Sequence, residues 1–236
     1  MRTLSIARRE LRAYFNSPVA YIVVTVFLVL SSYLFFEQAL IAGQADLRPF
    51  FDLAPLLFIF FAPAITMRLL AEERRVGTFQ VLITLPVSDT EVVVGKFLGA
   101  VWLLGTAIAL TLTYPLTLSF LGDLDRGAVI GGYLGLLLMG ACYLAIGLMA
   151  SSWTKNQIVS FIVAFAICFA LFLMGRLGPL VPRALTPIVE YVSLTTHFEN
   201  VARGVIDSRD VIYYVSLGGA CLFVAVQSLS SRQWRG

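Results

Sequence analysis

Six apolar runs, each about as long as a helix that crosses a bilayer, constrain this chain more than any other feature. A helix rises about 1.5 Å per residue, so about 20 apolar residues cross the hydrocarbon core. The runs are Val19–Gln38, Phe50–Leu70, Phe97–Leu121, Gly127–Ser151, Gln157–Gly175 and Val211–Ser231. They predict an all-α integral membrane protein with six transmembrane helices, forming one membrane domain over residues 1–236.

Composition agrees with a membrane environment. The chain is 59% hydrophobic and 13% charged, whereas soluble domains carry about a quarter charged residues. The formal charge of +3 comes from basic residues that flank the apolar runs, so no nucleic-acid partner is expected. Cys142, Cys168 and Cys221 lie inside apolar runs without C-x-x-C spacing, which predicts packing residues rather than metal ligands or disulfides.

The first 18 residues predict an amphipathic helix that lies in the membrane interface. Apolar residues recur at helical spacing and basic residues take the other side; the apolar set is Leu4, Ala7, Leu11, Tyr14 and Phe15. A signal peptide is the alternative. It is disfavoured because the following run is too long for the apolar region of a signal peptide.

The distribution of basic residues predicts the orientation. Six spans place both termini on one side, which then carries eleven Lys and Arg residues against six on the other. Because basic residues favour cytoplasmic loops, both termini and the segment 71–96 are expected in the cytoplasm. The connection 176–210 is expected outside, and the chain in the inner membrane.

The segment 71–96 is the one long charged stretch between two apolar runs. It begins with Glu72, Glu73, Arg74 and Arg75, followed by a turn at Gly77, a short apolar piece and a break at Pro86. Ser88 and Glu91 then match a capping box that starts a new helix. Such ordered structure at a membrane surface predicts a docking partner. A merely solvated charge cluster is the alternative.

Small residues and prolines mark specific positions within the spans. Gly127, Gly131 and Gly135 form a stripe at four-residue intervals, and Gly95 and Gly99 repeat the spacing. Such stripes let another helix approach closely, and packing within the chain is favoured over a dimer seam. The second span holds two prolines, Pro55 and Pro63, which predict a kink.

The connection 176–210 is expected to form a re-entrant or interfacial hairpin that covers the outer ends of the spans. One short helix over Glu190–Arg203 would carry Tyr191, Leu194, Phe198 and Val201 on one face. A polar cluster accompanies it, formed by His197, Glu199 and Arg203. The lone His197 is interpreted as a hydrogen-bonded interface residue in preference to a ligand or proton relay.

Several catalytic and transport signatures are absent from the sequence. Gly95-Lys96 is followed by Phe97, and Thr90 occupies the earlier glycine position, so there is no P-loop. No hydrolase motif and no paired His/Asp cluster occurs, so no catalytic, cofactor or metal site is expected in this chain. The spans lack midplane charges, which argues against an ion-coupled carrier. Work against a gradient would need ATP and Mg on a separate chain.

The cytoplasmic segment and the outer connection together carry a family resemblance. The first has the pattern E-x-x-x-G-T-x-x-x-L-x-T-x-P-V, from Glu73 to Val87. The second has S-L-x-x-H-F-E-x-x-x-R-G-V-I-D-x-x-D, from Ser193 to Asp210. With six spans and a basic N-terminal helix, the chain resembles permease subunits of ABC-2 transporters. The second pattern resembles the branch of gliding-motility permeases and the permease of nitrous-oxide-reductase maturation.

This resemblance implies a half-transporter that works as an exporter. It would pair with a second permease chain, either as a homodimer or with a related permease. Two separate ATP-binding subunits would dock on the cytoplasmic face, and the resemblance leaves open an extracytoplasmic accessory protein. Residues 78–85 would form the coupling helix; the coupling residues are Glu72, Glu73, Arg74, Arg75, Gly77, Thr78, Phe79, Leu82 and Pro86. A lipidic, amphipathic or peptide-like substrate and a mechanical role all stay open. The alternatives are a secondary carrier or channel and a non-transporting scaffold.

Overall fold

The protein is described here by a computed structural model that covers residues 2–42, 46–76, 88–120, 122, 124–177, 182, 186–205 and 207–233. Over these residues the chain is helical, without a strand. The helices are α1 (Arg2–Phe15), α2 (Pro18–Ala42), α3 (Arg48–Thr66), α4 (Ala71–Val76), α6 (Asp89–Leu110), α7 (Thr113–Ser119), α8 (Arg126–Trp153), α9 (Gln157–Leu177), α10 (Thr186–Val192), α11 (Leu194–Ala202) and α12 (Ser208–Gln233).

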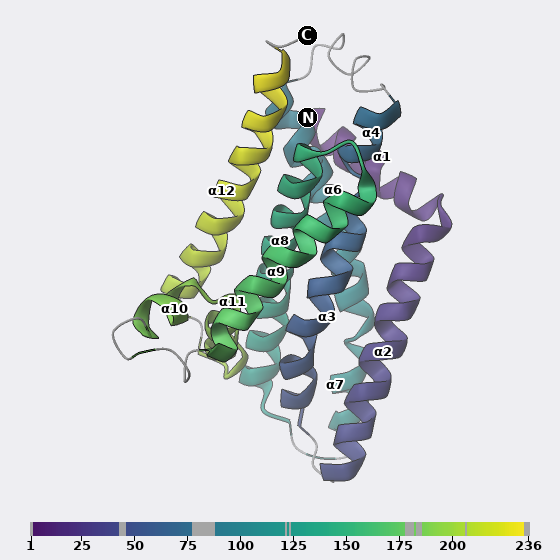
Figure 1. The fold of residues 1–236 in the computed structure, drawn as a ribbon. Helices are drawn as coiled ribbons and strands as arrows, with labels where there is room; N and C mark the ends of the chain where they lie inside the picture. The colour runs from purple at the N-terminus through teal and green to yellow at the C-terminus, as the bar shows by residue number, and fades with distance from the viewer. Residues whose placement is uncertain are drawn as a thin grey trace.

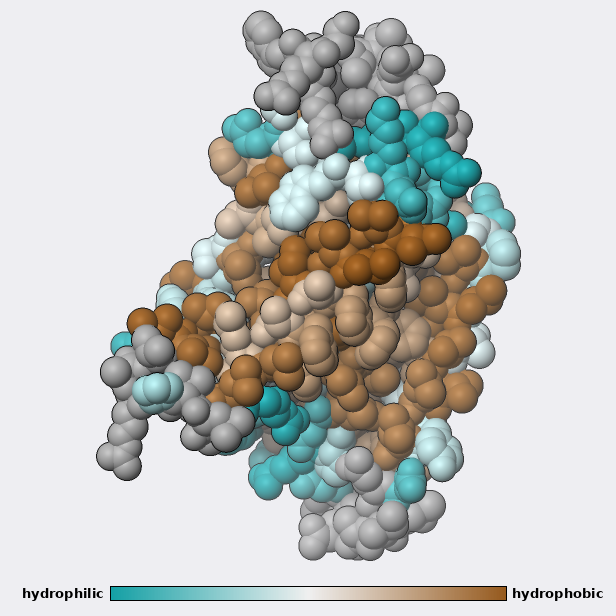
Figure 2. Space-filling model, viewed as in Figure 1, coloured by the Kyte–Doolittle hydropathy of each residue, from teal (hydrophilic) through white to brown (hydrophobic). Residues whose placement is uncertain are grey.

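Six helical stretches are long and apolar enough to cross a membrane, which confirms the predicted class. They are Pro18–Glu37, Arg48–Arg75, Asp89–Ser119, Arg126–Trp153, Gln157–Leu177 and Ser208–Ser231. Figure 2 shows their apolar side chains as a band across the middle of the molecule, with hydrophilic residues above and below it. A band of this kind is the surface expected for a chain whose solvent is lipid.

The two ends of the bundle differ in what they carry. Helix α1, α4 and the C-terminal end of α12 lie at one end, called here the terminal end (Figure 1). Helices α10 and α11 lie toward the other end, called the hairpin end, where α2 ends and α3 begins (Figure 1). The even number of spans therefore returns the chain to the end where it began.

Helix α8 is the centre of the bundle. It packs against α3, α6, α9, α11 and α12, and its residues Met139, Tyr143 and Leu144 are fully buried. Glycines make room for the neighbouring helices. A Cβ at Gly132 would overlap the ring of Phe51 in α3, and one at Gly140 would lie 2.5 Å from Leu104 in α6.

The glycine stripe of α8 packs within the chain, as predicted. A Cβ at Gly131 would overlap the carbonyl oxygen of Val201 and lie 3.1 Å from the Cα of Gly204. A Cβ at Gly135 would lie 3.0 Å from the ring of Phe198. Gly204 itself has φ +86°, a conformation that L side chains rarely adopt. The stripe therefore seats α11 against the bundle core.

The hairpin end differs from the prediction of one helix over Glu190–Arg203. Ser193 separates α10 from α11, and its hydroxyl accepts a hydrogen bond from the Thr196 N–H at 3.4 Å. Serine at this position ends one helix and caps the next. Leu194, Phe198 and Val201 lie on α11 and are buried, but Tyr191 belongs to α10 and is 66% exposed. The prediction that Tyr191 shares one helix face with these three residues was wrong, because the helix is broken at Ser193.

The third span is longer at its start and interrupted near its end. It begins at Asp89, because the capping box forms: Ser88 and Glu91 exchange hydrogen bonds of 3.2 and 3.0 Å. The predicted run to Leu121 is broken at Thr111, whose hydroxyl donates to the Ile108 carbonyl at 2.7 Å. The Tyr133 hydroxyl donates to the Thr111 carbonyl at 2.8 Å. Polar side chains within the bundle thus satisfy the interrupted backbone.

Substitution of Gly131 tests this packing. Gly131→Ala should lower the thermal midpoint of the purified chain, because the new methyl group overlaps backbone that has no rotamer with which to avoid it. Gly219→Ala in α12 is the matched control, since nothing lies within 4 Å of its Cβ position. The control should be neutral or stabilising by up to about 1 kcal/mol. Equal midpoints for both variants would contradict the seating of α11.

Candidate functional site

The site is built where α1 lies across the start of α6. Gly95 and Gly99 face α1: a Cβ at Gly95 would lie 2.7 Å from the Ile6 side chain, and one at Gly99 would lie 2.8 Å from Glu10 Cβ. The missing side chains let the two helices approach closely. α1 therefore packs through Ala7 and Tyr14, both buried, while Leu4 is 58% exposed.

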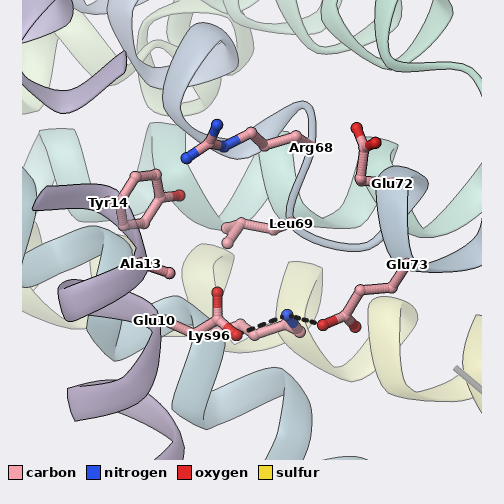
Figure 3. Close-up of a pocket in the computed structure, with 8 residues that line it drawn as sticks. All are labelled: Glu10, Ala13, Tyr14, Arg68, Leu69, Glu72, Glu73 and Lys96. Atoms are coloured by element: carbon pink, nitrogen blue, oxygen red, sulfur yellow. Dashed lines mark hydrogen bonds and ion pairs between the residues drawn. The ribbon is translucent and has the colours of Figure 1, made fainter. Parts of the chain in front are cut away.

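Lys96 lies between these glycines and joins three helices. Its Nζ is 2.7 Å from Glu73 Oε1 on α4 and 3.0 Å from Glu10 Oε1 on α1 (Figure 3). The Lys96 side chain is 1% exposed. An ammonium group removed from water is costly unless carboxylates surround it. The ion triad of Glu10, Glu73 and Lys96 therefore fixes α1, α4 and α6 to one another.

Tyr14 adds a second link between α1 and the end of α3. Its hydroxyl donates to the Ile65 carbonyl at 2.7 Å, and the guanidinium carbon of Arg68 lies 5.3 Å from the ring centroid. Burial raises the pKa of the Tyr14 phenol well above its usual value; Glu10 adds to the rise and Arg68 opposes it. The phenol thus stays protonated and keeps its hydrogen bond.

Ser151 of α8 holds the turn between α3 and α4. Its hydroxyl accepts from the N–H groups of Leu70 and Ala71, both at 3.1 Å, and donates to the Met67 carbonyl at 3.1 Å. Three backbone groups left over where α3 ends at Thr66 are satisfied in this way. The second span, Arg48–Arg75, therefore contains two helices, α3 and α4, joined by this turn.

Arg74 attaches α4 to the other side of the bundle. Its guanidinium donates to the Ser152 carbonyl of α8 and, at 3.4 Å, to the Ser228 carbonyl of α12. The Ser228 hydroxyl also donates to the Ser152 carbonyl, at 3.0 Å. The short helix α4 is thus held on one side by α1 and α6 and on the other by α8 and α12.

A cavity of about 330 Å³ opens beside the ion triad. Glu72 lines it together with Glu10, Ala13, Tyr14, Arg68, Leu69, Glu73 and Lys96. Figure 3 shows Arg68 directed toward Tyr14, and Glu72 directed away from Lys96. The cavity therefore carries both positive and negative side chains at the terminal end of the bundle.

The predicted coupling residues that the structure describes differ in their contacts and exposure. Glu73 and Arg74 are directed into the protein through the contacts above, Glu72 is half-buried, and Arg75 is exposed. The other predicted coupling residues lie outside the described residues: Gly77, Thr78, Phe79, Leu82 and Pro86.

Glu10 and Lys96 were not among the residues predicted for this site. A signal was available, because Glu10 is the only acidic residue in the basic segment 1–18 and Lys96 interrupts an otherwise small and apolar helix face.

The polar cluster of the hairpin end is also divided. His197 is buried, with Nδ1 2.6 Å from Asp210 Oδ1 and Nε2 3.0 Å from the Tyr191 carbonyl oxygen. Its ring stacks on Tyr213 at 4.0 Å. His197 is therefore hydrogen-bonded within the protein. It also forms a buried pair with Asp210, so the expectation that the chain holds no paired His/Asp cluster was wrong at this position. Glu199 and Arg203 are exposed and lie outside this pair.

The fold and the site describe a six-span, all-α membrane protein with an ordered charged assembly at one end. The chain belongs to the family described as "ABC-2 family transporter protein", which it matches over residues 4–225. Nearly the whole chain, including the ion triad, lies within the match. A search of curated proteins found no match. Members of this family are membrane components of transporters.

Removal of Lys96 tests the ion triad. Lys96→Met should destabilise the chain by about 3–5 kcal/mol, because two carboxylates lose the cation between them. The triple variant Lys96→Met, Glu10→Gln, Glu73→Gln should recover most of the loss, since no unpaired charge remains. Thermal unfolding of the detergent-purified chain measures both. A triple variant as unstable as the single one would show that the charges do not carry the effect.

Proposed function

We propose that this chain is the permease subunit of an ABC exporter, driven by a separate ATP-binding subunit that docks on residues 77–87. The ion triad is the observation that carries the proposal. It lies where α4 leads into this segment and α6 leads out of it, and it ties both helices to α1. Family membership supplies the expectation of an ATP-binding partner.

Force applied to residues 77–87 would reach the spans by two routes. One runs through Glu73 and Lys96 into α6 and α1. The other runs through Arg74 and the Ser151 contacts into α8 and α12. A segment anchored on both sides transmits displacement, because packed helices move as bodies rather than deform continuously.

The proposed assembly contains two copies of this chain, or this chain and a related permease, with two ATP-binding subunits. ATP and Mg bind on those subunits. The terminal end faces the cytoplasm and the hairpin end faces outward across the inner membrane, in accord with the basic bias of the loops. The pattern from Ser193 to Asp210 supports the branch of gliding-motility and nitrous-oxide-reductase-maturation permeases, and apolar spans suit a lipidic, amphipathic or peptide-like cargo.

Truncation of the docking segment tests the partnership. Phe79→Ala with Leu82→Ala should reduce recovery of the ATP-binding subunit, because apolar anchors in an interface cost about 1–3 kcal/mol or more when truncated. The measurement is co-purification from native membranes at matched permease levels. The double variant should still insert, since neither residue belongs to a described span.

Leu116→Ala with Ile130→Ala provides the control. Both side chains are more than 60% exposed, at 62% and 67%, and lie on spans away from the terminal end. This pair should leave recovery of the ATP-binding subunit unchanged. Equal recovery with the Phe79/Leu82 variant and the wild type would rule out docking on residues 77–87.

Cysteine labelling tests the orientation. A cysteine at Thr90 should react with an impermeant maleimide only from the cytoplasmic side, and one at Ser208 only from the outside. Both positions are exposed, and Thr90 is used because Ser88 caps α6. The native cysteines are buried, so their background should be low. The reverse pattern of labelling would invert the proposed topology.

A further inference from the structure

We propose that the hairpin end carries a binding site for a phosphoethanolamine group, the headgroup of a zwitterionic lipid. The site is a cavity of about 510 Å³ between α3 and α11. Four charged residues line it, together with Phe51, Phe198 and Ala202; they are Arg48, Asp52, Glu199 and Arg203. This site lies at the opposite end of the bundle from the ion triad and does not depend on the proposed docking of an ATP-binding subunit.

The floor of the cavity is aromatic and fixed. Phe51 and Phe198 are both 2% exposed, and their rings meet edge to face with centroids 6.3 Å apart. Gly132 and Gly135 of α8 lie against these rings. A Cβ at Gly132 would overlap the ring of Phe51, and one at Gly135 would lie 3.0 Å from the ring of Phe198. A preformed, largely apolar floor with a few polar groups at its rim is the usual form of a small-ligand site.

The rim carries two positive and two negative charges. Arg48 and Asp52 are four residues apart on α3, and Glu199 and Arg203 are four residues apart at α11, so each pair shares one helix face. Asp52, Glu199 and Arg203 form no ion pair within 4 Å among the residues that the structure describes. Arg48 has one contact of 3.7 Å, to Asp46. Charges of both signs are therefore free to engage a ligand.

A ligand that carries both signs satisfies this rim best. A phosphate accepts charge-assisted hydrogen bonds from arginine, and a primary ammonium donates them to carboxylates. A purely anionic headgroup leaves Asp52 and Glu199 opposed to its charge, and a quaternary ammonium has no N–H to donate.

The position of the cavity favours a lipid source. Arg48 is the first residue of the second span, so the cavity opens at the depth where headgroups lie.

Native mass spectrometry of the full-length chain tests the site, with titration of phosphatidylethanolamine, phosphatidylcholine and phosphatidylglycerol that carry the same acyl chains. Wild type should retain phosphatidylethanolamine at least about tenfold more tightly than phosphatidylglycerol, a difference of one strong charged contact. Arg48→Gln with Arg203→Gln should remove this binding. Asp52→Asn with Glu199→Gln should remove the preference of the protein for phosphatidylethanolamine over phosphatidylcholine.

Arg126→Gln with Glu190→Gln is the matched control. Both residues are exposed at the hairpin end and lie outside the cavity lining, so binding should be unchanged. If free phosphoethanolamine at equal concentration displaces bound phosphatidylethanolamine, the site binds the soluble zwitterion. If the lipid adduct persists, the site binds the lipid. Equal retention of all three lipids, or unchanged binding in folded cavity variants, would overturn the proposal.

Discussion

The desolvated ammonium of Lys96 is the constraint on which the terminal end of this protein depends. A charge that is 1% exposed persists only where carboxylates reach it. The two that do so come from α1 and α4, helices that the apolar pattern alone would not bring together. The ion triad thus fixes the N-terminal helix against α4 and α6, the two described helices that flank residues 77–87 in the sequence.

Small residues make this arrangement possible. Gly95 and Gly99 remove the side chains that would separate α1 from α6, and Gly131 and Gly135 do the same for α11 on α8. In a bilayer, close packing and polar contacts replace the hydrophobic drive that assembles soluble cores. The protein uses one glycine stripe at each end, and each stripe seats an element that does not itself cross the membrane.

The spans were predictable because length and apolarity report directly on the bilayer. The capping box at Ser88 was predictable because it is local in sequence. The pairing of Lys96 with Glu10 was not, since it joins residues 86 positions apart and depends on which stripe of α1 meets α6. The break at Ser193 was missed because the helical periodicity continues through it. The contacts of Asp210 with His197 likewise needed the three-dimensional path of α11 into α12.

The proposed function predicts that α1 and α6 move as one body when the ATP-binding subunit binds nucleotide. Spin labels at Arg9 and Thr90, both exposed, would report their separation by pulsed electron resonance in the purified complex. The account predicts one narrow distance distribution that is the same without nucleotide and with ATP, and that broadens when Lys96 is replaced by methionine. A wild-type distance that shifts on ATP binding would contradict it.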